Sequence, residues 1–130
     1  MKSVAILTSA FLVLTGSAFA HHRFVDEFDA KSPVTLQGTV TKVDWSAPHV
    51  MIHADVKDKD GKMTEWAFEA AGPTQLEGKG WHKDTLKPGD TFTVHAYRAK
   101  SEPNVAGART ITLADGKKLS AAPNDGGPKA

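Results

Sequence analysis

The clearest fold signal lies in residues 49–70, which read HVMIHADVKDKDGKMTEWAFEA. Apolar and polar residues alternate on either side of an Asp-Gly pair, a pattern typical of two half-buried strands joined as a β-hairpin. A two-residue turn would place Val56 on the same face as Glu65, whereas a three-residue loop over residues 59–61 unites the apolar residues of both strands. Because a one-residue slip moves every side chain to the other face, burial selects the three-residue loop, with Gly61 in a left-handed conformation.

The selected register predicts two chemically different faces for this hairpin. The inner face is apolar and comprises Val50, Ile52, Ala54, Trp66, Phe68 and Ala70. The outer face carries His49, Met51, His53 and Glu69, with Met51 directly opposite Glu69. At a rise of ~3.3 Å per residue, His49 and His53 lie roughly 13 Å apart, which is too far for both to bind one metal ion. Either histidine is close enough to share an ion with Met51.

The rest of the chain predicts three more strands and one short helix. Alternating, β-branched segments indicate strands at residues 34–44, 91–99 and 108–114, and a helix is indicated at residues 73–81. Five short strands with a helix between the third and the fourth favour an all-β fold, a small five-stranded OB-like barrel over residues 34–119. A small sandwich or an SH3-like barrel is the alternative architecture.

Two polar segments flank the predicted domain. Residues 21–33, HHRFVDEFDAKSP, are polar apart from three apolar anchors, and they predict an N-terminal arm. Residues 120–130, SAAPNDGGPKA, have the composition of a disordered tail.

The first 20 residues have the organisation of a secretory signal peptide. Lys2 supplies a positive charge, and the apolar run over residues 4–14 is too short to cross a bilayer as a mature helix. Ala18 and Ala20 are the small residues that signal peptidase requires. We therefore expect cleavage after Ala20, export to a bacterial periplasm, and no stable membrane insertion of the cleaved chain.

Composition excludes several classes of function. The chain has 130 residues, no Cys, and a formal net charge of +1. The lack of Cys excludes a disulfide scaffold, a Cys-ligated zinc site, a thiol nucleophile and a copper–thiolate site. Near-neutral charge argues against nucleic acid as a partner. The sequence also contains no G-x-S-x-G elbow, no Gly-rich phosphate loop and no H-E-x-x-H, so it favours a binding protein over an enzyme.

Several segments resemble an uncharacterised family of small exported bacterial proteins, a domain of unknown function. They are HHRF at the expected mature start, PVTLQGTVTKVDWSAPHVMIHADV, TEWAFEA, GWHKDTLKPGDTFTV and TLADGKKL. The D-W-x-x-P-H element that ends at His49 is the most specific of them, although the family usually carries Asn in place of Ala47. The resemblance implies export and a compact β domain, and it brings no activity, cofactor or catalytic residue.

The expected mature N-terminus is a candidate copper ligand. Cleavage after Ala20 gives His21 a free α-amine beside its imidazole, and these two nitrogens can chelate one ion. A third nitrogen from His49 or His53 would complete the set, with Met51 as a soft axial partner and His22 as a competing ligand. Imidazole and amine nitrogens suit Cu(II), which has the highest affinity among the divalent first-row metals.

Two other functions remain open from the sequence. The first is a metal-free interaction module that binds a small molecule, a glycan or a partner protein on the hairpin's outer face, with Trp45, Glu69 and His22 as candidate contacts. The second is a copper-dependent oxidase that uses the same N-terminal histidine. Neither has a dedicated sequence motif.

Overall fold

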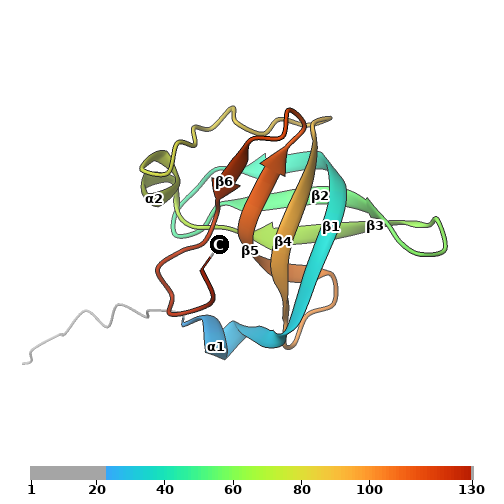
Figure 1. Cartoon of the computed structure of the whole chain (residues 1–130), viewed down its shortest axis with the longest axis horizontal. Coiled ribbons are helices and arrows are strands. Elements are labelled where there is room, and N and C mark those ends of the chain that lie inside the picture. Colours follow the sequence, from blue (N-terminus) through green and yellow to red (C-terminus); the bar gives the residue numbers. More distant parts are fainter. Residues whose placement is uncertain (1–22, 130) are drawn as a thin grey trace, which may run out of the picture.

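The structure of the chain, a computed structural model, describes residues 23–129 and is mostly β-sheet (Figure 1). Its elements are α1 (Phe24–Glu27), β1 (Phe28–Asp44), β2 (Met51–Lys57), β3 (Met63–Glu69), α2 (Pro73–Glu77), β4 (Thr91–Ala99), β5 (Val105–Leu113) and β6 (Lys118–Ser120). The predicted signal peptide and both N-terminal histidines lie outside the described residues. Within the described part of the chain, neither helix has the length and hydropathy needed to cross a membrane.

The strands form one sheet in the order β3-β2-β1-β4-β5-β6, and consecutive neighbours in this order are antiparallel. β3 also pairs with β5 in parallel, so that Glu69 lies opposite Gly107 and the sheet curls back on itself. The prediction of a β-sheet protein is therefore confirmed. The described residues contain six strands, because the short β6, which the sequence does not predict, pairs with β5.

The hairpin of β2 and β3 has the predicted register. Met51 lies opposite Glu69 and Lys57 opposite Met63, and the Asp58 amide donates to the Lys62 carbonyl at 2.8 Å. Gly61 has a φ of 80°, which is the left-handed conformation that favours glycine. The apolar residues of the hairpin accordingly face the core, which they share with β1, β4, β5 and α2 through Val40, Leu76, Phe92, Val94, Ile111 and others.

β1 begins earlier than its sequence pattern predicts. Residues 28–33 belong to β1, whereas the sequence places them in an arm. The pairing with β4 is irregular between Phe28 and Pro33, and there the Lys31 amide and the Ser32 hydroxyl donate to the Asp29 carboxylate, both at 2.9 Å. These two hydrogen bonds, the backbone bond first, lower the pKa of Asp29 below its ordinary value of 3.8.

The C-terminal segment packs against the sheet and α1 as far as Gly127, so the prediction of a disordered tail is wrong for these residues. We call residues 121–129 the C-terminal strap. Ala121 and Ala122 are buried, and the Ala121 amide donates to the Arg109 carbonyl at 2.9 Å. Figure 1 shows the strap running from β6 to the side of α1, where the Phe24 amide donates to the Asp125 carbonyl at 3.0 Å.

α1 and the strap cover the outer side of β4 and β5 with a second apolar cluster. The Phe24 ring contacts the edge of Tyr97, with ring centroids 5.4 Å apart, and lies 5.7 Å from the ring of Phe28. Phe28 in turn covers Gly107, where a Cβ would lie 3.1 Å from ring carbons. This cluster fixes the described start of the chain against β5, at the edge where β5 meets β3.

Candidate functional site

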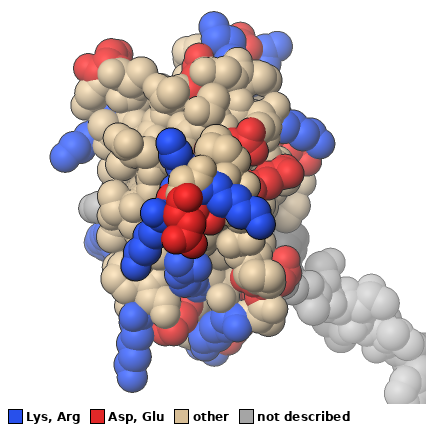
Figure 2. Space-filling view, turned by 90° about the vertical axis from the view of Figure 1, so that its right-hand side faces the viewer, with Lys and Arg blue, Asp and Glu red and all other residues tan. Residues whose placement is uncertain are grey.

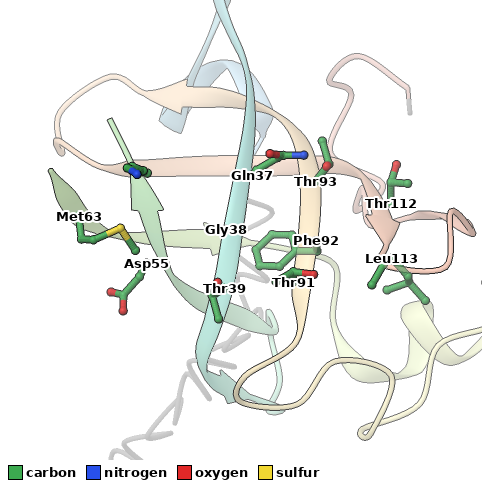
Figure 3. Close-up of a pocket in the computed structure, with 12 residues that line it drawn as sticks. Gln37, Gly38, Thr39, Asp55, Met63, Thr91, Phe92, Thr93, Thr112 and Leu113 are labelled. Atoms are coloured by element: carbon green, nitrogen blue, oxygen red, sulfur yellow. The ribbon is translucent and has the colours of Figure 1, made fainter. Parts of the chain in front are cut away.

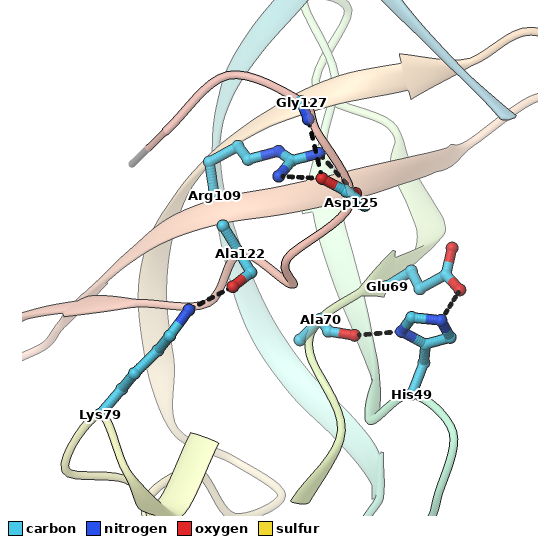
Figure 4. A network of polar contacts seen from close by, with 8 residues as sticks. All are labelled: His49, Glu69, Ala70, Lys79, Arg109, Ala122, Asp125 and Gly127. Carbon is cyan, nitrogen blue, oxygen red and sulfur yellow. Dashed lines mark hydrogen bonds and ion pairs between the residues drawn. The ribbon is translucent and has the colours of Figure 1, made fainter. Parts of the chain in front are cut away.

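His49 is oriented by the backbone at the end of β3. The residue lies just before β2, which begins at Met51, two residues later than the sequence predicts. Its Nδ1 is 2.9 Å from the carbonyl oxygen of Ala70 (Figure 4). A carbonyl oxygen can only accept, so Nδ1 donates the hydrogen of this bond. In the neutral ring the lone pair is then on Nε2.

The Nε2 side of the His49 ring faces Glu69. His49 Nε2 lies 3.6 Å from Glu69 Oε1, and the two side chains are 24% and 20% exposed. Two adjacent ligand atoms that bind one ion at about 2.1 Å are about 3.0 Å apart in square-planar geometry and about 3.4 Å apart in tetrahedral geometry. The spacing of this nitrogen and this oxygen therefore fits two ligands of a single ion without rearrangement of the backbone.

His49 and Glu69 line a small pocket under the start of the chain. The pocket has a volume of about 10 Å³, enough for about one water-sized group. Its lining residues are Arg23, Phe24, Glu27, Phe28, His49, Glu69, Gly107, Arg109, Pro123 and Asp125. Three of these are carboxylates and two are guanidinium groups, so the lining has a formal charge of −1 when His49 is neutral. A cation would offset this charge.

The opposite wall of the pocket is built by Arg109 and Asp125. Arg109 projects from β5 away from the main core, is 1% exposed, and forms a bidentate ion pair with Asp125 of the strap (Figure 4). Its guanidinium carbon lies 4.4 Å from the centre of the Phe24 ring. The ion pair thus holds both the strap and α1 in place beside the pocket.

Sequence reasoning did not identify Arg109 and Asp125 as site residues. Arg109 has the parity of Ile111 and Leu113, so simple alternation along β5 would place it on their side of the strand. The register of β5 against β4 shifts between Thr110 and Ala108, and this irregularity at Arg109 leaves its side chain outside the main core. Asp125 lies in a segment whose composition indicates disorder. A long-range ion pair of this kind leaves no periodic signal, because its two partners are 16 residues apart in different elements.

The other predicted site residues are not brought together with His49. His53 lies opposite Ala67 and Lys42 on the half-buried outer face, and Met51 lies opposite Glu69 without lining the pocket. Trp45 is half-buried and packs against the core. Among residues 23–129, no three His, Asp or Glu side chains group closely enough to hold a metal ion. His21 and His22 precede the described residues.

A larger open groove lies elsewhere on the sheet. It has a volume of about 510 Å³, and its lining includes Thr39, Thr91, Thr93, Thr112, Gln37 and Asp55 (Figure 3). The side chains come from β1, β2, β4 and β5. None of the residues predicted for a metal or ligand site lines this groove.

Charge on the surface is mixed. Figure 2 shows the side of the molecule that lies to the right in Figure 1, and on it Lys and Arg side chains alternate with Asp and Glu. The loop between β2 and β3 repeats this mixture, since it contains Asp58 and Asp60 together with Lys59 and Lys62. Basic and acidic side chains are therefore interspersed on this face.

Comparison with family models identifies the chain. Residues 10–109 match the model of DUF6152, a family of unknown function. The chain belongs to the DUF6152 family. No curated protein and no solved structure matches it.

The DUF6152 match covers part of the pocket. It includes His49 and Glu69 as well as Arg109, whereas Asp125 and the rest of the strap lie beyond its last residue. In this DUF6152 chain, the wall that buries Arg109 is therefore supplied by a segment outside the matched range.

Proposed function

We propose that this DUF6152 chain is an exported, periplasmic copper-binding domain that holds its ion through His21 and His49. Signal peptidase cleavage after Ala20 supplies the free amine of His21, and the amine, the imidazole of His21 and Nε2 of His49 form a set of three nitrogens. Cu(II) has the highest affinity for such a set among the divalent first-row metals.

One observation carries this proposal. α1 and the strap fix Arg23 at the rim of the pocket that His49 lines. Two residues span at most about 7 Å of extended chain, so the link from Arg23 is short enough for His21 to reach that rim. In the proposed form the mature N-terminus can therefore reach His49, whose Nε2 faces a pocket of negative formal charge.

The geometry favours His49 over His53 as the third nitrogen. Metal-binding histidines generally donate their second ring N–H to a carbonyl or a carboxylate, which fixes the ring and its tautomer. His49 makes this bond with Ala70. His53 lies four residues further along the chain, roughly 13 Å away on a straight strand, and it does not line the pocket.

The strand pairing supports an OB-like plan for this domain. We infer a five-stranded OB-like barrel in which β6 and the strap are additions. The support is that β3 pairs with both β2 and β5, and that α2 lies between β3 and β4 in the chain. In such folds the loops and the outer face of the second and third strands bind ligands, which agrees with the position of His49 and Glu69.

A copper titration of the mature chain tests the proposal. We expect one equivalent of Cu(II) to bind, and we expect the affinity to fall at least tenfold in His21→Ala and in His49→Gln. His53→Gln is the matched control and should bind like the unchanged protein. A chain with one extra Ala before His21 keeps every side chain but removes the amine–imidazole chelate, so it should also lose affinity. Equal binding by all these variants would refute the proposal.

The open groove supports a second candidate function, a metal-free module that binds a small polar molecule. The groove's volume of about 510 Å³ is within the range of ligand sites, and its threonine hydroxyls can exchange hydrogen bonds with a hydroxylated ligand such as a glycan. Chemical-shift mapping with a panel of oligosaccharides tests this function. Shifts at Thr39, Thr93 and Thr112 would support it, and their absence at millimolar ligand would exclude glycans.

A further inference from the structure

We infer that Glu69 acts as an anionic ligand that makes the proposed site selective for Cu(II) over Cu(I). The inference rests on the proposed copper site and adds the oxidation state of its ion. Its basis is the position of the Glu69 carboxylate, whose Oε1 lies 3.6 Å from Nε2 of His49 at the same pocket.

The structure places the hard carboxylate of Glu69, and not the soft thioether of Met51, in the pocket beside His49. Glu69 and Met51 lie opposite each other on the β2–β3 hairpin, so the strand pairing alone allows either side chain to accompany His49. Glu69 lines the pocket and Met51 does not. Thioether ligands select Cu(I), whereas imidazole and carboxylate ligands suit divalent ions. The set that gathers around His49 is therefore the set expected for Cu(II).

The charge of the pocket also favours Cu(II) over Cu(I). Its lining has a formal charge of −1 when His49 is neutral, and the side chains of Glu69 and His49 are mostly removed from solvent. Interactions between charges weaken less in a partly buried pocket than in bulk water. The second positive charge of Cu(II) is therefore stabilised more strongly than the single charge of Cu(I).

Two affinities measured on the same protein test the inference. Cu(II) affinity is obtained by competition with glycine, and Cu(I) affinity by competition with a colorimetric Cu(I) chelator under ascorbate. The variants are Glu69→Gln, which preserves shape and removes charge, and Met51→Leu as the matched control on the opposite strand. Thermal unfolding of both variants checks that the fold is retained.

We expect Glu69→Gln to weaken Cu(II) binding about tenfold and to leave Cu(I) binding within twofold. For this one-electron couple, a tenfold change in the ratio raises the reduction potential by about 59 mV. Met51→Leu should change neither affinity. If the unchanged chain binds copper but Glu69→Gln weakens Cu(II) and Cu(I) binding equally, or weakens neither, the inference about Glu69 is wrong and the proposed copper site still stands. Failure of the unchanged chain to bind Cu(II) would overturn the proposed function with it.

Discussion

Arg109 and Asp125 form a bidentate ion pair that is almost completely buried, with Nη2 2.9 Å from Oδ2 and Nη1 3.1 Å from Oδ1. Their side chains are 1% and 7% exposed. The pair joins the middle of β5 to the C-terminal strap, and the strap accepts a hydrogen bond from the backbone of Phe24. Both described ends of the chain are therefore anchored at one buried charge pair on the outer side of the sheet.

Removal of the Asp125 carboxylate should strongly destabilise the protein. In Asp125→Asn the guanidinium of Arg109 remains buried without its counter-charge, and breaking such a pair costs about 3–5 kcal/mol. Urea unfolding measures the change. Asp84→Asn, at an exposed position, is the control and should stay within about 0.5 kcal/mol of the unchanged protein. A loss of similar size in both variants would contradict the role of the pair.

The anchoring of the two ends predicts slow hydrogen exchange at specific amides. The Phe24 amide donates to Asp125 and the Ala121 amide to Arg109, so both should exchange much more slowly than the amides of the exposed loop over residues 101–103. Hydrogen exchange followed by NMR measures these rates. Exchange at Phe24 as fast as in that loop would show that the strap does not hold α1.

Gly107 should not tolerate a side chain. A Cβ at this position would lie 3.1 Å from two carbons of the Phe28 ring, which is itself packed against Phe24. We expect Gly107→Ala to cost about 1–3 kcal/mol, as overpacking generally does. Gly78→Ala, at the end of α2 with an ordinary helical φ of −64°, is the control and should be close to neutral. Thermal unfolding of both variants compares them, and equal midpoints would show that the Phe28 ring gives way at little cost.

At the proposed copper site, Gly72 should affect Cu(II) affinity through the loop that carries His49. A Cβ at Gly72 would lie 2.7 Å from the Pro48 carbonyl oxygen, so the loop must shift in Gly72→Ala. Displacing a ligand's supporting contacts typically lowers metal affinity 10- to 100-fold, and we expect about tenfold for Cu(II). A copper titration with Gly78→Ala as the reference measures this, and equal affinities in the two variants would count against His49 as a ligand.

The lowered pKa of Asp29 predicts a pH-dependent contribution to stability. Because hydrogen bonds from Lys31 and Ser32 favour the carboxylate in the folded protein, the contribution is present above the unfolded value of 3.8 and is lost as the pH falls through the lower folded value. In the Asp29→Asn variant this part of the pH dependence should disappear. NMR titration of the carboxyl carbon in the unchanged protein measures the folded pKa directly, and a value at or above 3.8 would contradict the prediction.

The hairpin shows how far local reasoning extends. Along β2 and the second half of β3 the residues alternate between buried and half-buried with the predicted period, and Met51 lies opposite Glu69. This succeeds because side-chain alternation in a strand and the geometry of a short turn are both local properties. The same reasoning places β4 at residues 91–99, the bounds that the structure shows.

The errors share a different physical cause. Residues 28–33 and the C-terminal strap are polar and irregular by composition, and each is ordered by partners far away in the chain. Arg109 lies at a shift in the register of β4 and β5, which strand alternation does not predict, and it is buried because the strap covers it.

The amino-acid sequence by itself determined the β-hairpin, its register and the two faces that follow from it, because these depend on periodicity over a few residues. Only the tertiary structure decided that His49 rather than His53 is paired with Glu69, and that the described ends of the chain meet beside them. That choice depends on the contact of β3 with β5 and on the Arg109–Asp125 pair, which join segments whose separation in the sequence carries no periodic signal.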